Sequence, residues 1–150
     1  MPRAYPTCPA LDPRQVADLL HRYRPRRWRV YQSRYRRDHG GTGLADWQGK
    51  ILSVPTLIDA GDIHTFLHEC GHVHLGHGER DIPDHLAEYE AEMYGLHVMW
   101  AERLTLPPML VSESRRIIGE AIAADMLKGV SIDPHALAWA DGKRLKLEGL

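Results

Sequence analysis

The segment His68-Glu69-Cys70-Gly71-His72 combines the residue types and the spacing of a metal site. Residues four apart on a helix share one face, so the imidazoles of His68 and His72 can bind the same ion. Glu69 follows His68 directly, where its carboxylate can reach a metal-bound water and act as a general base. The segment therefore predicts a hydrolytic metal centre on a helix.

A second helix, expected over residues 84–104, offers a third ligand. At 100° per residue, one face of that helix includes Glu90, together with Leu86, Met93, His97, Trp100 and Leu104. Glu88 and Glu92 point away from this face. A buried carboxylate is costly unless it is paired or binds a metal. Three ligands and an open fourth position are typical of catalytic zinc. The predicted zinc ligands are His68, His72 and Glu90.

Other interpretations of these residues stay open at this point. The two motif histidines can be ordinary surface residues, or the zinc can serve only to support the fold. Glu90 can pair with a buried Arg or with His97, itself a candidate partner of the site. His64, one turn before the motif, is expected to flank the site. A third His ligand after the motif is not supported, since Leu75 and Gly78 occupy the positions that need Gly and His.

The elements around the motif indicate an α+β domain spanning residues 1–150. Strands are expected near residues 28–31 and 47–55, where Pro55 suggests a sheet edge. Helices are expected from Pro13, from Asp62, over 84–104, over 112–127 and from Pro134. We expect a small, mostly antiparallel sheet with helices on one face. Residues 1–12 are expected to form an irregular arm and 142–150 a polar tail.

Composition narrows the class of protein. With 150 residues, 43% of them hydrophobic, the chain can bury a core and is not expected to be disordered. It has no apolar run of 18 residues and no secretory signal core, which argues against a membrane span or export. Two cysteines are too few for a disulfide framework. A cytoplasmic protein is therefore expected.

The net charge of −1 is unevenly distributed. Residues 1–50 carry 11 Lys and Arg against 4 Asp and Glu, whereas residues 51–150 carry 8 against 16. Eight arginines lie between Arg22 and Arg37. This segment can form a surface for nucleic acid or for an acidic partner. Alternatively, the basic half packs against the acidic half of the same domain.

Residues 68–77 (HECGHVHLGH) and 88–95 (EYEAEMYG) together resemble the ImmA/IrrE family of zinc metallopeptidases. The resemblance implies that His68, His72 and Glu90 hold zinc and that Glu69 is the catalytic base. It also implies a minimal, zincin-like (gluzincin) fold in which a short edge strand, here near Lys50–Val54, lies beside the cleft. Members of this family often cleave repressors or other regulators.

The expected function is that of a zinc-dependent endopeptidase acting on a protein or peptide substrate, such as a regulator or repressor. Tyr94 and His97 are the candidate oxyanion donors. A substrate strand is expected to add at Ile51–Val54. The alternative is a metal-stabilised binding module that uses Arg22–Arg37 to hold nucleic acid or an acidic partner. The two can also combine, as a protease brought to a regulator on DNA.

Overall fold

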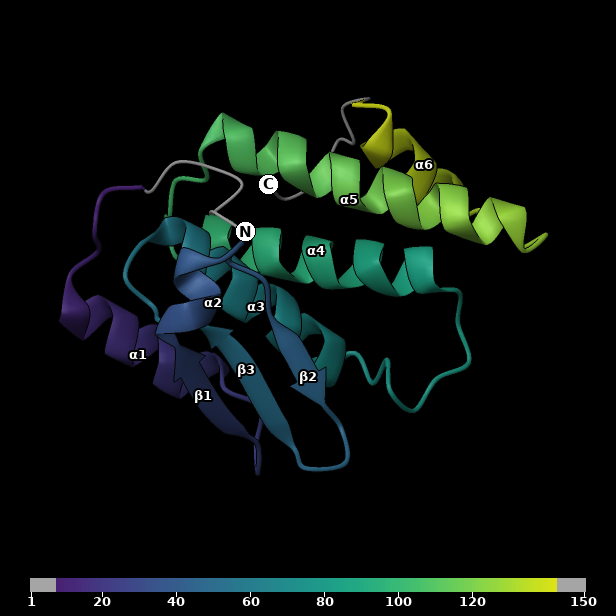
Figure 1. The fold of residues 1–150 in the computed structure, drawn as a ribbon. Helices are drawn as coiled ribbons and strands as arrows, with labels where there is room; N and C mark the ends of the chain where they lie inside the picture. Colours follow the sequence, from purple (N-terminus) through teal and green to yellow (C-terminus); the bar gives the residue numbers. More distant parts are fainter. Residues whose placement is uncertain (1–7, 143–150) are drawn as a thin grey trace.

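The computed structural model describes residues 8–142, which form six helices and a three-stranded sheet. Figure 1 shows the sheet at the bottom, α3 above it, α4 above α3, and α5 with α6 across the top. This confirms the α+β class. In chain order the elements are α1 (Pro13–Tyr23), β1 (Arg29–Ser33), α2 (Arg34–Asp38), β2 (Leu44–Asp46), β3 (Ile51–Pro55), α3 (Ala60–His74), α4 (Asp84–Ala101), α5 (Pro108–Leu127) and α6 (Pro134–Ala140).

The sheet is mixed, whereas a mostly antiparallel sheet was expected. β2 and β3 are joined by a short hairpin, which makes them antiparallel. β1 is followed by α2 and β2 before the chain enters β3, and this longer connection lets β1 and β3 run parallel. The three-residue β2 was missed in the sequence because it follows a glycine-rich stretch.

β3 is the central strand, in the order β1-β3-β2. The prediction of an edge strand at Lys50–Val54 is therefore wrong, as is a substrate strand added at Ile51–Val54: both sides of β3 are already hydrogen-bonded. Pro55 is tolerated because it is the last residue of the strand.

One face of the sheet carries the main core. Leu52 and Val54 alternate along β3 and are fully buried, as are Phe66 and Leu67 of α3. Ile51 and Ser53 point to the opposite face and are only partly buried. The helices thus cover one face, which fixes the position of α3 on the sheet.

The start of α3 is set by a capping box rather than by Asp62 alone. Asp59 is the N-cap, and its carboxylate accepts from the Asp62 N–H at 3.1 Å. The Asp62 carboxylate accepts in return from the Asp59 N–H at 3.0 Å. Arg37 of α2 donates to both carboxylates, at 2.9 and 3.0 Å. The helix that carries the motif is therefore anchored at its first turn.

α3 and α4 cross at a glycine. A Cβ on Gly71 would lie 3.0 Å from the Ala91 carbonyl oxygen and 3.1 Å from the Ala91 Cα. Only a residue without a side chain allows this approach. The close crossing brings side chains of α4 within reach of the motif histidines.

α4 is packed on two sides. Toward α3 it buries Glu92, Gly95 and Met99, and on its other side Tyr89 and Met93 pack against the small core of α5 and α6. That second core is built from Ile118, Ile122, Ala136 and Trp139. A helix buried on two sides has no single apolar face, so periodicity alone does not show which side meets α3.

The arm and the tail fall largely outside the described residues. The part of the arm that is described is tied to the loop before α3: Leu11 donates its N–H to the Ile58 carbonyl at 2.8 Å, and Ala10 bridges to Asp59. Residues 1–7 and 143–150, which hold the rest of the arm and of the tail, lie outside the structure described. Within residues 8–142 there is no helix with the length and apolar character needed to span a membrane.

Candidate metal centre

Three side chains meet at the crossing of α3 and α4. The Nε2 atoms of His68 and His72 lie 3.1 Å apart. One oxygen of Glu88 lies 3.1 Å from His68 Nε2, and the other lies 3.4 Å from His72 Nε2. Among the described residues, this is the group of three or more His, Cys, Asp and Glu whose donor atoms converge closely enough to hold one ion.

The spacing of these donors fits zinc. Zinc lies about 2.0–2.1 Å from nitrogen and oxygen ligands in a tetrahedron, which places neighbouring ligand atoms roughly 3.3–3.4 Å apart. The His68–His72 and His68–Glu88 distances lie slightly below that value, and the distance of 3.4 Å from His72 is to the other Glu88 oxygen. Two imidazoles and a carboxylate are also the donor types of known catalytic zinc sites. The Glu88 side chain is 34% exposed, so the group is open to solvent on its side.

Glu92, one turn after Glu88, supports His68 from behind. Its Oε2 lies 3.1 Å from His68 Nδ1, and its Oε1 lies 2.6 Å from His64 Nε2. A carboxylate on Nδ1 holds the proton there and leaves Nε2 as the free donor atom, the usual arrangement behind a metal-binding histidine. His64 thus flanks the site, as expected, through Glu92.

The histidines and carboxylates of the cluster shift each other's pKa values. Burial lowers the pKa of His68, but hydrogen bonds to Glu88 and Glu92 outweigh it and raise this pKa to about 10. The histidine partners hold the pKa of both carboxyl groups far below the ordinary value, against the opposing effect of burial. In the metal-free protein a proton on His68 therefore lies between two carboxylates, and a bound cation would replace it.

His72 is supported by another imidazole. Its Nδ1 lies 2.8 Å from Nδ1 of His77, which sits in the loop after α3. Burial, followed by the charge of His72, lowers the pKa of His77, so the neutral form of His77 is favoured. The sequence pattern does not support a third His ligand after the motif, and the structure places His77 beside His72.

Glu69 lies beside the cluster on the same helix. It is 9% exposed, and burial raises the pKa of its carboxyl group, while the charges of His68 and His72 lower it. Gly43, just before β2, packs against this side chain: a Cβ there would lie 2.5 Å from Glu69 Cγ and 3.0 Å from Oε1. The backbone of Gly43 therefore packs directly against the Glu69 side chain and leaves no room for a larger residue at position 43.

Glu90, predicted as the third ligand, is not at the cluster. Its carboxylate accepts from the Arg80 guanidinium at 3.2 and 3.3 Å. The structure brings Glu88 to the two imidazoles instead. The physical reason is the two-sided packing of α4: the face that meets α3 carries Glu88, Glu92 and Gly95, not the apolar stripe that contained Glu90. Gly95 was the available signal, since a small residue marks a close helix contact.

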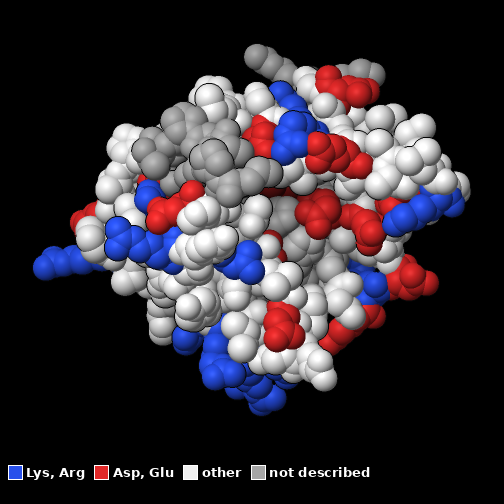
Figure 2. Space-filling view, in the orientation of Figure 1, with Lys and Arg blue, Asp and Glu red and all other residues white. Residues whose placement is uncertain are grey.

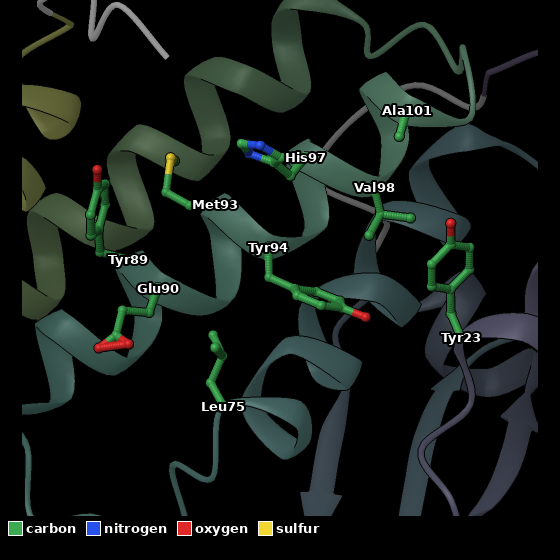
Figure 3. A pocket seen from close by; sticks show the side chains of 9 residues that line it. All are labelled: Tyr23, Leu75, Tyr89, Glu90, Met93, Tyr94, His97, Val98 and Ala101. Carbon is green, nitrogen blue, oxygen red and sulfur yellow. The ribbon is translucent and has the colours of Figure 1, made fainter. Parts of the chain in front are cut away.

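Tyr94 and His97 also lie away from the three donor atoms. Together with Glu90 they line an open groove of about 640 Å³ along the outer side of α4. Figure 3 shows Glu90 at one end of this groove and Tyr23 at the other. Burial raises the pKa of Tyr94 to about 12. Among the described residues, neither side chain forms a hydrogen bond, an ion pair or a ring contact with His68, His72 or Glu88, and their role as oxyanion donors stays a prediction.

Of the eight arginines between Arg22 and Arg37, two form ion pairs and six form none within residues 8–142. Arg22 pairs with Asp18 and Glu102, and Arg37 pairs with Asp59 and Asp62, so part of the basic half does pack against acidic residues. Within residues 8–142, no ion pair engages the exposed Arg26, Arg27, Arg29 and Lys50. Figure 2 shows blue side chains gathered at the lower edge, where β1 and β3 begin.

Known proteins give no further guide to this site. The chain matches no protein-family model, no curated protein and no solved structure. What the site can do must therefore be argued from its own geometry.

Proposed function

We propose that the protein is a zinc-dependent peptidase whose metal ligands are His68, His72 and Glu88. The convergence of their donor atoms at 3.1, 3.1 and 3.4 Å is the observation that carries the proposal. Glu69 beside them, on the same turn as His68, supplies the group that a purely structural zinc site would not need. The likeness of residues 68–77 to ImmA/IrrE metallopeptidases supports the same chemistry.

The bound zinc would act as a Lewis acid and lower the pKa of a coordinated water. Glu69 takes a proton from the attacking water while the water oxygen forms a bond to the peptide carbonyl carbon. When the C–N bond breaks, Glu69 passes that proton to the departing amine nitrogen. A raised pKa suits this double task, because the carboxyl group must both accept and release the proton near neutral pH.

The free side of β2 is the best place for an extended substrate. β2 pairs with β3 on one side, and the order of the sheet leaves its other side at the edge. Gly43, immediately before β2, contacts Glu69, so this edge begins beside the proposed base. A substrate strand added here would gain backbone hydrogen bonds and carry its peptide group past the site.

The test combines metal content with cleavage. Zinc per chain is measured by mass spectrometry on untagged wild type, Glu88→Ala and Glu69→Gln, with Glu120→Ala as a control on an exposed glutamate of α5. We expect about one zinc per chain, as for a mononuclear site, in all but Glu88→Ala. Cleavage of a labelled peptide library is expected only from wild type and the control.

Two results would contradict this function. One is a wild-type protein that does not retain zinc supplied at micromolar concentration. The other is a Glu69→Gln variant that cleaves peptides as fast as wild type, because the proposed mechanism assigns the base to Glu69.

A binding module is the second candidate, and the unpaired arginines at the start of β1 favour it. Arg26, Arg27 and Arg29 are exposed, and Arg29 lines a shallow depression together with Tyr31, which is 63% exposed. Such a surface would bind single-stranded nucleic acid with an affinity that falls steeply with salt. Titration of a fluorescent oligonucleotide at two salt concentrations tests it. Binding must survive Glu69→Gln and be lost when the three arginines are replaced by Ala.

A further inference from the structure

The two proposed histidine ligands are held from behind in different ways. His68 Nδ1 contacts a carboxylate, Glu92, directly. His72 Nδ1 contacts another imidazole, that of His77, at 2.8 Å between the two Nδ1 atoms. A neutral imidazole has one donor nitrogen and one acceptor nitrogen. The direction of this hydrogen bond therefore depends on where His77 holds its own proton.

The geometry of His72 sets that direction. Its Nε2 faces His68 and Glu88 and must carry no proton to bind a metal, so the ring proton lies on Nδ1. His77 Nδ1 then has to accept, which leaves the His77 proton on Nε2. That Nε2 is buried and makes no hydrogen bond within the described residues. A buried N–H of this kind needs a nearby acceptor.

Glu90 provides it. Its Oε2 lies 3.6 Å from His77 Nε2, a separation that a shift of about half an ångström would turn into a hydrogen bond. The His77 side chain is 5% exposed, which leaves little room for water to take that role. Arg80 holds the Glu90 carboxylate in place from the loop side, at 3.2 and 3.3 Å.

We propose that Glu90 is a positioning residue, which acts through His77 to keep the Nε2 atom of His72 free for the metal. The inference rests on the proposed function in taking His72 as a ligand. In this proposal the series of contacts Arg80–Glu90–His77 orients the His72 ring, as Glu92 orients the His68 ring. His77 must keep its proton on Nε2 for this series of contacts to work.

The experiment reads the ring protons and the zinc affinity of the full-length protein. Two-bond ¹⁵N–¹H correlation spectra of the zinc-loaded protein report which nitrogen of His77 is protonated, with a His77→Asn variant for assignment. Zinc dissociation constants are measured by competition with a chromophoric chelator for wild type, Glu90→Leu and Glu90→Gln. Glu102→Leu is the matched control, since Glu102 also pairs with an arginine but lies near α1.

We expect His77 to be protonated on Nε2 in wild type and in Glu90→Gln, whose amide oxygen can still accept. In Glu90→Leu this single form is lost and zinc binds roughly tenfold more weakly, at the lower end of the effect of removing a supporting residue. Glu102→Leu keeps wild-type affinity. The inference is overturned if His77 is protonated on Nδ1 in wild type, or if Glu90→Leu matches wild type in both measurements.

These outcomes are separate from the cleavage test of the proposed function, because neither measurement involves cleavage. A protein that binds zinc but cleaves no peptide contradicts the peptidase and leaves the role of Glu90 to be decided by the spectra. If the protein cleaves peptides but Glu90→Leu changes neither its zinc affinity nor the His77 spectrum, only the positioning role is contradicted. Urea unfolding of the metal-free Glu90→Leu variant is the control for folding. If its unfolding free energy equals that of wild type, a loss of zinc affinity comes from the site and not from a destabilised fold.

Discussion

The contact between Gly43 and Glu69 predicts a strong coupling between two residues that are 26 positions apart in the sequence. The three atoms closest to a Cβ built on Gly43 all belong to Glu69: Cγ at 2.5 Å, Cδ at 3.0 Å and Oε1 at 3.0 Å. Ordinary carbon contacts lie at about 3.5–4.0 Å. Gly43→Ala therefore forces Glu69 or the chain before β2 to move by about 1 Å.

The expected cost of Gly43→Ala is about 1–3 kcal/mol of unfolding free energy, the usual range for an overpacked site. Since the backbone of Gly43 is not left-handed, the added methyl group brings no backbone strain of its own. In a Glu69→Ala background all three crowded atoms are gone. The same substitution should then cost almost nothing, so that the coupling energy is close to the whole 1–3 kcal/mol.

The assay is urea unfolding of the metal-free wild type, the two single variants and the double variant. Gly119→Ala is the control, because a Cβ on Gly119 meets nothing closer than 4.0 Å and its helical position should be stabilised by about 0.5–1 kcal/mol. Additive effects of Gly43→Ala and Glu69→Ala, within about 0.5 kcal/mol, would refute the contact. Zinc content should not change in Gly43→Ala, whereas cleavage should fall about 100-fold, as for a 1 Å displacement of a catalytic group.

Two further predictions concern packing and pH. Gly71→Ala should destabilise the metal-free protein by about 1–3 kcal/mol in urea unfolding, since its Cβ would meet the backbone of Ala91, and an unchanged midpoint would contradict the close crossing. The buried Asp125 accepts from the backbone and ring N–H of His85, and these bonds lower the pKa of its carboxyl group below 3.8. Its contribution is therefore present above about pH 4 and is lost as the pH falls through the lowered value. The unfolding free energy of chelator-treated wild type should fall more steeply with decreasing pH than that of Asp125→Asn, and parallel curves would argue against this role.

The motif helix could be predicted from the sequence because spacing alone decides it. His68 and His72 share a face in any helix, and the structure does place their Nε2 atoms side by side. Residue types were equally sufficient for the α+β class and for the starts of α1 and α6, since Pro13 and Pro134 each follow an Asp that caps the helix. α2 was missed, and α5 begins at Pro108, four residues before the expected start.

The carboxylate that joins the two imidazoles, that of Glu88, could not be predicted in the same way. The prediction of Glu90 required α4 to have one buried side, marked by its apolar residues. In the structure the side that meets α3 carries charged residues because it serves the cluster, while apolar residues such as Met93 serve the contact with α5 and α6. Periodicity reports where apolar residues lie, and it cannot separate two packing partners. β2 was missed for a different reason: it has only three residues, too few to show alternation, and it follows a glycine-rich stretch.

Three glutamates at alternate positions of α4 therefore make three different sets of contacts, and helix geometry explains the division. Glu88 and Glu92 are four residues apart, so they lie one above the other on the side that meets α3. Their separation matches the two nitrogens of one imidazole: Glu88 contacts Nε2 of His68 and Glu92 contacts Nδ1, both at 3.1 Å. Glu90 lies about 200° from Glu88 around the helix and cannot join them. Its carboxylate approaches the cluster only through His77, in the loop after α3, which lies between Glu90 and His72. This geometry favours an indirect role for Glu90 over metal ligation.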